Sequence, residues 1–247
     1  MTFRFLLAAA AMLMTAASAA SAQTAAPTYA EKCEAAGHPD WAFGGEDTPL
    51  QYRPLFGCSE RSGPRRDADR QFVEELKAKG FSDARLGDEL IGMGWKWLGA
   101  GQLPAALNRF NLAFEYAPEN GEVYQGIAIV MANAGMPPRV AGYWFRQAVE
   151  APEGRSGRFA DYGQFLTMQG DYDAARPQLQ KALEKEPGHA WAMMHLAHGY
   201  FEQGKVEAGC DMVERIAAAA PPPGGDAARF RELVGHWRGR AAKAGCE

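Results

Sequence analysis

The chain has 247 residues, 47% of them hydrophobic, and a formal net charge of −4 at neutral pH. This composition predicts a soluble protein with enough apolar residues to bury a core. Its mildly acidic balance argues against nucleic acid as a partner, because nucleic-acid-binding proteins carry basic faces that displace the counterions of phosphate groups.

The first 22 residues have the layout of a secretory signal peptide. Arg4 gives the segment a positive start, residues 5–17 form an apolar run, and Ala-Ser-Ala at residues 20–22 is a small-x-small cleavage site. The run is too short for a comfortable membrane span, so an uncleaved anchor is the less favoured alternative. We expect cleavage after residue 22, no membrane insertion afterwards, and residence in the periplasm, with release to the medium as the alternative.

Residues 23–66 are rich in proline and glycine, so regular structure should be sparse there. Cys33 and Cys58 lie in this segment, whereas Cys210 and Cys246 lie near the other end of the chain. Four cysteines in an exported chain indicate disulfides and allow three pairings. We favour Cys33–Cys58 and Cys210–Cys246, because a last helix antiparallel to the helix of Cys210 would bring Cys246 back to it. A redox pair is disfavoured, since the sequence has no C-x-x-C motif.

Helical periodicity begins after this segment, and it predicts a helical lead-in over residues 67–86. Asp67 opens the helix and Gly80 fits its end. Apolar residues recur between them and just beyond, near i, i+4 spacing: Phe72, Val73, Leu76 and Phe81.

A period of about 34 residues dominates the rest of the chain. It is marked by Gly101, Gly135, Gly170 and Gly204, which lie 34, 35 and 34 residues apart. Each glycine is followed by a small residue, a large apolar residue, a second small or apolar residue and a closing proline. In the first copy these residues are Ala106, Phe110, Ala113 and Pro118. Such a period predicts a two-helix repeat, and such repeats stack into solenoids that mostly bind other proteins.

The landmarks place four repeats at about 87–120, 121–155, 156–189 and 190–223. Copy two has one extra residue in its Pro137-Pro138 turn, and copy four has Gly209 where the others have alanine. Residues 224–247 are predicted as a capping helix. That helix has an apolar face and a charged face, which suits the open end of a solenoid. Its apolar face carries Phe230, Leu233, Val234 and Trp237.

These repeats resemble the tetratricopeptide repeat family. The residues of the first copy that match the family pattern are Leu90, Gly94, Trp97, Ala106, Phe110, Ala113 and Pro118. The resemblance covers residues 87–223 and implies an all-α fold. We expect a right-handed α-solenoid of about four helix pairs, with a C-terminal capping helix and an irregular N-terminal segment. The resemblance also implies that the first helix of each pair lines a concave groove.

Family positions that face this groove carry amides, aromatics and methionines here, which suits an extended or helical peptide. The partner-binding residues that the resemblance implies are Trp95, Glu122, Gln125, Asn133, Gln164, Met168, Trp191, Met194, His198, Phe201 and Glu202. Some family members clamp a C-terminal carboxylate with lysine and arginine, but these positions hold neither, so that clamp is not expected. For any single residue, packing against its neighbours is the alternative.

No motif indicates catalysis, because the sequence has no G-x-S-x-G elbow, no phosphate-binding glycine loop and no H-E-x-x-H. We therefore expect no enzyme and no cofactor. His195 and His198 lie one helical turn apart, a spacing that can chelate a metal, and Glu202 lies one turn beyond. No motif supplies a further ligand. We therefore expect these histidines to pack against neighbouring helices or to face water, and we predict no metal.

The leading hypothesis is an exported, non-enzymatic scaffold that binds a peptide segment of an envelope protein. One alternative is a periplasmic chaperone-like carrier of unfolded clients. Another is a metal- or small-ligand-binding protein that uses His195 and His198. The sequence leaves open whether residues 23–66 fold over the groove as a lid or cap the first repeat.

Overall fold

A computed structural model describes residues 28–59, 63–221 and 226–246. In these ranges the chain forms helices and short 3-10 turns, with one isolated β-bridge between Asn120 and Glu153. The predicted signal peptide, residues 1–22, lies outside them. None of the described helices is long and apolar enough to cross a membrane.

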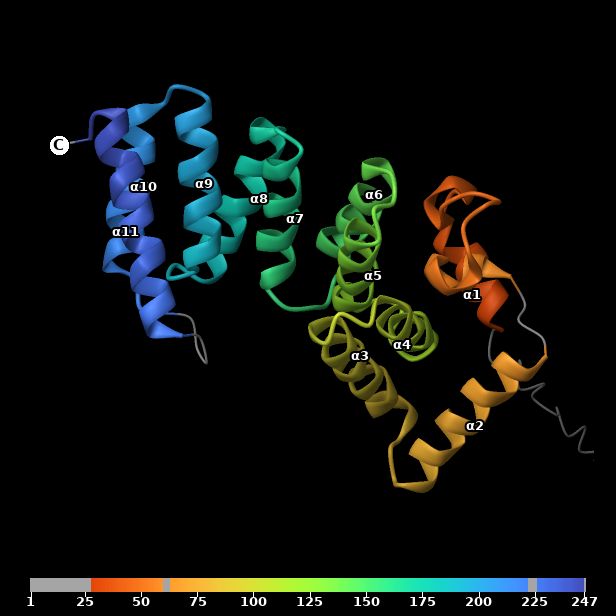
Figure 1. The fold of residues 1–247 in the computed structure, drawn as a ribbon. Coiled ribbons are helices and arrows are strands. Elements are labelled where there is room, and N and C mark those ends of the chain that lie inside the picture. The colour runs from red at the N-terminus through yellow and green to blue at the C-terminus, as the bar shows by residue number, and fades with distance from the viewer. Residues whose placement is uncertain (1–27, 60–62, 222–225, 247) are drawn as a thin grey trace, which may run out of the picture.

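Eight helices form four pairs that stack one after another along the chain (Figure 1). The first helices of the pairs are α3 (Asp83–Gly99), α5 (Gly121–Asn133), α7 (Gly157–Met168) and α9 (Ala190–Glu202). The second helices are α4 (Leu103–Tyr116), α6 (Pro138–Glu150), α8 (Tyr172–Lys185) and α10 (Val206–Ala218). A single helix, α11 (Ala227–Ala244), follows at the C-terminal end. The predicted all-α solenoid with a final helix is confirmed.

The glycines that mark the sequence period lie at the turn inside each pair. Gly101, Gly135, Gly170 and Gly204 have φ angles of 73°, 71°, 77° and 69°. These angles lie in the left-handed region, which glycine adopts readily and other residues do not. The chain reverses direction at each of these points, which explains why the glycines recur once per repeat.

Small residues on the first helices make room for large residues on the second helices. Phe110 of α4 is fully buried and lies against two glycines, Gly94 of its own pair and Gly126 of the next. A Cβ atom added to Gly94 would lie 2.6 Å from Cε1 of Phe110, and one added to Gly126 would lie closer still. In the third pair Gly163 lies in the same way against Leu179. Close packing within and between pairs therefore depends on these glycines.

The extra residue in the turn of copy two and the glycine at position 209 of copy four are both explained by local packing. Gly209 leaves space for the ring of Phe201, since an added Cβ atom would lie 2.5 Å from Cε1 of that ring. The longer turn of copy two brings Met136 against the N-terminal segment. A Cβ atom added to Gly44 there would lie 2.7 Å from Cε of Met136.

The N-terminal segment has more regular structure than its proline content predicted. It comprises α1 (Tyr29–Ala36) and three 3-10 turns, η1 (Asp40–Phe43), η2 (Leu50–Tyr52) and η3 (Pro54–Cys58). Thr28 and Glu31 form a capping box at the start of α1. The segment packs mainly on α4 and α6, the second helices of the first two pairs (Figure 1). It is therefore neither a lid over the first helices nor a cap on the end of the first pair.

Buried hydrogen bonds anchor this segment to the second helices. The backbone N–H of Leu55 donates to Oδ1 of Asn111 at 2.7 Å, and Nδ2 of Asn111 donates to the carbonyl of Arg53 at 3.0 Å. Nε1 of Trp144 on α6 donates to the carbonyl of Ala42 at 2.8 Å. Because Asn111 and Trp144 are buried, each bond satisfies polar groups that water does not reach.

The lead-in helix α2 (Pro64–Ala78) begins three residues before Asp67, because a proline fits the first turn of a helix, where its missing N–H is not needed. Gly80, with a φ angle of 91°, follows its end. Side chains hold α2 against α4. Nδ2 of Asn108 donates to Asp69 at 3.0 Å, and the guanidinium of Arg109 lies 4.0 Å from the ring centroid of Phe72.

Two disulfides fasten the ends of the described fold. Cys33 is bonded to Cys58 and Cys210 to Cys246, with Cα–Cα distances of 5.5 Å and 5.7 Å. These are the two favoured pairings. The second disulfide joins α10 to the end of α11, whose Phe230 and Trp237 are buried against the last pair.

Candidate functional site

The four first helices α3, α5, α7 and α9 carry the predicted partner-binding residues, and we call their shared surface the first-helix face. Polar links cross it from one repeat to the next. Nε1 of Trp95 on α3 donates to Oε2 of Glu122 on α5 at 3.1 Å. Nε2 of Gln125 on α5 donates to Oδ2 of Asp161 on α7 at 2.6 Å.

Glu122 is nearly inaccessible, with 7% of its surface exposed. Its second oxygen pairs with Nε of Arg155 at 3.2 Å, and Arg155 itself is largely exposed. Trp95 is half-buried, and its ring meets that of Phe110 edge-on at 5.3 Å between centroids. The structure thus places Trp95 and Glu122 in contact with each other, where their first role is to join repeats one and two.

Gln125 is also buried, at 6% exposure, and its amide is engaged by Asp161. Burial raises the pKa of Asp161, while the hydrogen bond from Gln125 and the nearby His189 act in the opposite direction. The hydrogen bond between Gln125 and Asp161 joins repeats two and three. Oδ1 of Asp161 can still accept a hydrogen bond at the surface of α7, because a carboxylate has two oxygens.

A hollow of about 540 Å³ opens between α5 and α7, beside Asp161. Three predicted residues line it, Asn133, Gln164 and Met168, and all three are exposed. Met168 has 73% of its surface exposed, the highest value among the large apolar residues in the described part of the chain. Apolar walls come from Ile129, Phe145 and Phe165. The structure therefore brings the amides of Asn133 and Gln164 and the thioether of Met168 together beside an apolar wall.

Of the predicted partner-binding residues on α9, some contact the C-terminal helix α11 and others do not. Arg240 of α11 lies 2.8 Å from Nδ1 of His198 and donates to Oε1 of Glu202 at 2.6 Å. Its guanidinium also lies 5.6 Å from the ring centroid of Phe201. These three predicted residues are therefore occupied by the C-terminal helix. Met194 is buried, whereas Trp191 at the start of α9 is 51% exposed.

The alternative of a metal site depends on the histidines of α9. Among the described residues, no three His, Cys, Asp or Glu side chains are grouped so that they could hold a metal ion. His195 faces the junction with α7 and α8, and burial, with smaller effects of His198 and His189, lowers its pKa to about 4. His189 caps α9, since its Nδ1 accepts from the N–H of Ala192.

Sequence reasoning missed Asp161, Arg155 and Arg240 as parts of this surface. Arg155 comes from the connection between repeats, and Arg240 from the final helix, so no position in the repeat pattern marks them. Asp161 occupies the position that is Gly126 in the repeat before it, 35 residues earlier. Comparison of copies can flag that substitution but cannot show that Gln125 lies opposite it.

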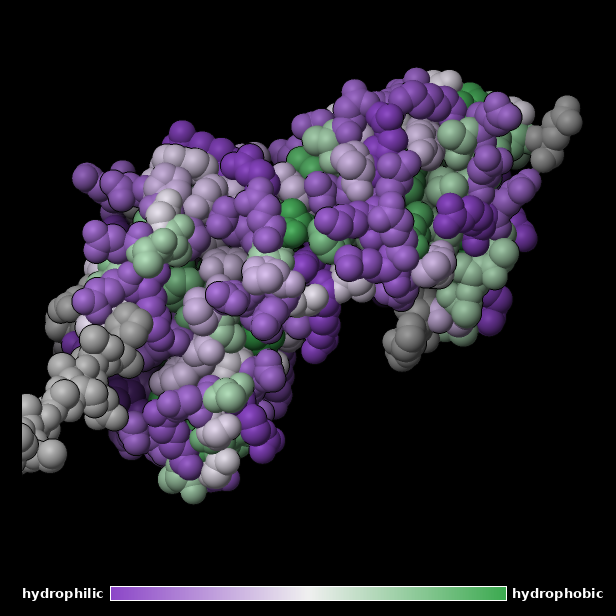
Figure 2. Space-filling model, turned by 180° about the vertical axis from the view of Figure 1, so that it is seen from behind, coloured by the Kyte–Doolittle hydropathy of each residue, from purple (hydrophilic) through white to green (hydrophobic). Residues whose placement is uncertain are grey.

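Hydrophilic side chains cover most of the molecular face in Figure 2, and the apolar residues visible there form small separate areas. This pattern is ordinary for a protein that meets water. The large apolar residues that are exposed on the first helices are Trp97, Met168 and Trp191. They lie on three different helices, α3, α7 and α9.

Residues 166–234 match the family model for the tetratricopeptide repeat. No curated protein matches the chain. The solved structure of PilF from Pseudomonas aeruginosa is 21% identical over 54% of this chain and 60% of that chain, with a TM-score of 0.50. This identity level supports a shared fold and nothing finer.

Two further solved structures show weaker likeness. MamA from Desulfovibrio magneticus RS-1 is 18% identical over 66% of this chain and 92% of that chain, with a TM-score of 0.49. An O-GlcNAc transferase from Thermobaculum terrenum is 19% identical over 55% of this chain and only 27% of that chain, with a TM-score of 0.48. The family model thus assigns residues 166–234 to the tetratricopeptide repeat, and the four stacked helix pairs show the α-solenoid fold of such repeats over residues 83–218.

Proposed function

We propose that the chain is a non-enzymatic, exported scaffold that binds a peptide segment of an envelope protein on its first-helix face. The observation that supports this most is the hollow between α5 and α7. There, exposed Met168 stands beside the amides of Asn133 and Gln164. Repeat proteins of this class use such stacked surfaces to bind other proteins.

The chemistry of the hollow suits a peptide backbone with one apolar side chain. Amide side chains both donate and accept, so Asn133 and Gln164 can pair with backbone groups of a bound segment. Met168 is unbranched and polarizable, which lets it fit apolar side chains of different shape. Of the described residues that line the hollow, none is lysine or arginine and Asp161 is the one acidic residue, so an acidic peptide is disfavoured.

A peptide-library selection followed by calorimetry tests the site. The informative variant replaces Asn133, Gln164 and Met168 with alanine together, because all three side chains are exposed and their removal leaves the core intact. A matched control replaces exposed residues of the second helices, Gln180→Ala with Val206→Ser. We expect a peptide selected on the unchanged protein to bind the triple variant at least tenfold more weakly and the control variant equally well.

Equal affinity for all three proteins would overturn the peptide site on this face. Enrichment of many unrelated apolar peptides, all weakened by the triple variant, would instead favour the chaperone-like carrier. Both results are interpretable only if the variants keep the helicity and thermal midpoint of the unchanged protein, which is measured first.

Export is supported by the signal-peptide pattern of residues 1–22 and by the two disulfides, which persist in oxidising compartments. The test is to produce the full chain in a bacterium and measure the mass of the protein in the periplasmic fraction. We expect a chain that begins at Gln23 with all four cysteines oxidised. A full-length, reduced chain in the cytoplasm would contradict export and would leave the peptide-binding test unaffected.

A further inference from the structure

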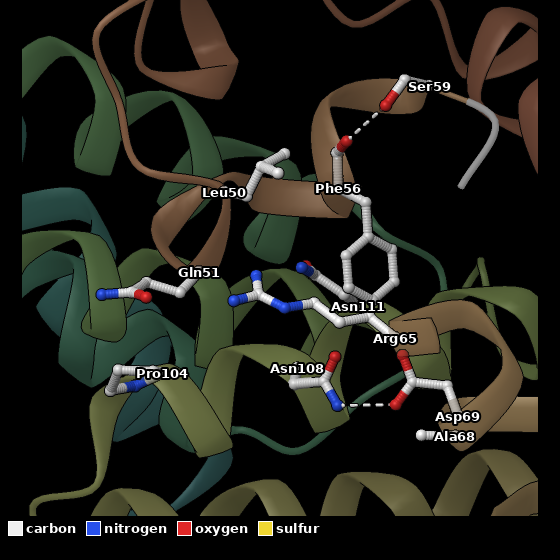
Figure 3. Close-up of a pocket in the computed structure, with 10 residues that line it drawn as sticks. All are labelled: Leu50, Gln51, Phe56, Ser59, Arg65, Ala68, Asp69, Pro104, Asn108 and Asn111. Carbon is white, nitrogen blue, oxygen red and sulfur yellow. Dashed lines mark hydrogen bonds between the residues drawn. The ribbon is translucent and has the colours of Figure 1, made fainter. Parts of the chain in front are cut away.

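A cleft of about 500 Å³ lies between the N-terminal segment, α2 and α4 (Figure 3). Its size falls in the range of roughly 300–1,000 Å³ that is usual for small-molecule sites. It does not overlap the first-helix face, because its walls come from helices outside that set. The residues that matter for its chemistry are Leu50, Phe56, Arg65, Asp69, Pro104 and Asn108.

Apolar groups form one part of the cleft. Leu50 of η2 is 59% exposed, although it is a large aliphatic residue. Phe56 of η3 and Pro104 of α4 line the same space, and Figure 3 shows the ring of Phe56 directed into it. Covering the exposed side chain of Leu50 with an apolar ligand is favourable, at about 25 cal/mol for each Å² removed from water.

Arg65 supplies a positive charge inside the cleft. Figure 3 shows its side chain extending from α2 across the space toward Gln51. Within the part of the chain that the structure describes, its guanidinium has no hydrogen-bond or ion-pair partner. The next residue, Arg66, lines a neighbouring hollow, which shares Ser59 and Asp69 with the cleft but not Arg65. The two arginines are thus neighbours in sequence but line two adjoining hollows.

The other polar groups limit the net charge of the site. Asp69 lies one turn after Arg65 and accepts a hydrogen bond from Nδ2 of Asn108 at 3.0 Å. Among the described residues that line the cleft, Arg65 is the one cation and Asp69 the one anion, and this balance favours a monoanion over a doubly charged phosphate. The planar fork of arginine matches the two oxygens of a carboxylate.

We propose that this cleft binds a small amphiphilic monocarboxylate, with the carboxylate on Arg65 and the apolar part against Leu50, Phe56 and Pro104. The ligand chemistry is an apolar chain that ends in one carboxylate. Two sources fit it, a medium-chain fatty acid and the free C-terminus of an apolar peptide. This inference does not rest on the proposed function of the first-helix face.

Calorimetric titration of the full chain with octanoate tests the proposal, together with octylammonium as a probe of equal length and opposite charge. We expect saturable binding of octanoate and none of octylammonium. Arg65→Gln should weaken octanoate binding about tenfold or more, because a charge-assisted hydrogen bond is lost. Leu50→Ser should also weaken it, whereas Arg66→Gln should leave it unchanged. The triple variant of Asn133, Gln164 and Met168 should bind octanoate normally, which separates this site from the peptide site.

The source of the ligand is distinguished by a second pair of probes, N-acetyl-Leu-Leu as the free acid and as the amide. The free acid should bind more tightly than its amide, because the amide lacks the carboxylate. Tighter binding of octanoate than of the peptide acid indicates a fatty acid, and the reverse order indicates a peptide C-terminus. The proposal is overturned if neither acid binds saturably at millimolar concentration. It is also overturned if Arg65→Gln and Arg66→Gln weaken binding equally. Arg65 is exposed, so the variant is expected to fold, and its thermal midpoint is checked first.

Discussion

Phe110 of α4 packs directly against the backbone of Gly126 on α5, so the ring of one repeat occupies the space of a missing side chain on the next. The ring is fully buried and is also confined by Gly94. Gly126→Ala places a methyl group against ring carbons that cannot move aside. The helix gains about 1 kcal/mol from replacing glycine by alanine, but overpacking costs roughly 1–3 kcal/mol, so we expect net destabilisation.

The matched control is Gly92→Ala. Gly92 is the equivalent residue of the preceding repeat (126 − 92 = 34), and the space around it is open. This variant should be more stable than the unchanged protein by about 0.5–1 kcal/mol, because only the helix-propensity gain remains. Urea unfolding of both variants measures the two changes. Similar stability changes of the two variants would mean that the Phe110 contact does not determine the spacing of the repeats.

Asn111 on α4 fastens the N-terminal segment through both ends of its amide. Asn111→Leu keeps the size of the side chain but leaves the N–H of Leu55 and the carbonyl of Arg53 without partners. We expect a loss of about 2–4 kcal/mol, since each buried unsatisfied group costs about 1–3 kcal/mol. Hydrogen exchange is the measurement. Amides of residues 28–59 should exchange faster, while those of α7 to α10 stay protected.

Asn133→Ala is the control for that experiment, because Asn133 is exposed and bonds only to the carbonyl of Ile129 in its own helix. It should leave exchange in residues 28–59 unchanged. If Asn111→Leu behaves in the same way, the hydrogen bonds from Trp144 to Ala42 and from Lys32 to Glu115 hold the segment without the amide of Asn111.

The repeat architecture could be predicted from the sequence because the period is recorded in residues with strict local requirements. Gly101 must adopt a positive φ angle, and Gly94 must admit Phe110, so spacing alone identifies the helix pairs. The N-terminal segment could not be placed in the same way. Its position depends on long-range contacts, such as that of His38 with Trp144, which no periodic pattern records.

The predicted binding surface was limited for a related reason. Family positions identify residues on the first helices, but not what lies opposite them. Glu122 and Gln125 face partners on neighbouring helices, and His198 and Glu202 face Arg240 of the final helix. Only the structure separates these residues from Asn133, Gln164 and Met168, which border an open hollow. Which of them contribute to partner binding stays a prediction.

Two partly buried histidines should make stability fall as the pH is lowered. Burial lowers the pKa of both His38 and His195 to about 4, so each is neutral in the folded protein at pH 5. In the unfolded chain they take up a proton near pH 6.5. The unfolded state therefore binds more protons between pH 6.5 and 4, and folding free energy is lost over that window. Above pH 6.5 these groups contribute no pH dependence.

The measurement is urea unfolding at pH 7 and pH 5, where most carboxylates remain ionised. We expect a decrease on the order of 1 kcal/mol per histidine. The double variant His38→Gln, His195→Gln should show a smaller decrease between the two pH values, whatever its stability at pH 7. An unchanged decrease would mean that other groups cause the pH dependence.

The Cys210–Cys246 disulfide should matter locally, because each repeat contacts only its neighbours. The bond closes a loop of 36 residues, for which the loop-entropy model gives about 4 kcal/mol of stabilisation. Replacing both cysteines with serine should release α11 and separate Arg240 from His198 and Glu202. Limited proteolysis should then cut within residues 226–246 well before the rest of the chain.

In the parallel variant Cys33→Ser, Cys58→Ser, early cleavage should move to residues 28–59 instead. Early cleavage at both ends in either variant would show that the two termini unfold together, contrary to nearest-neighbour coupling along the solenoid.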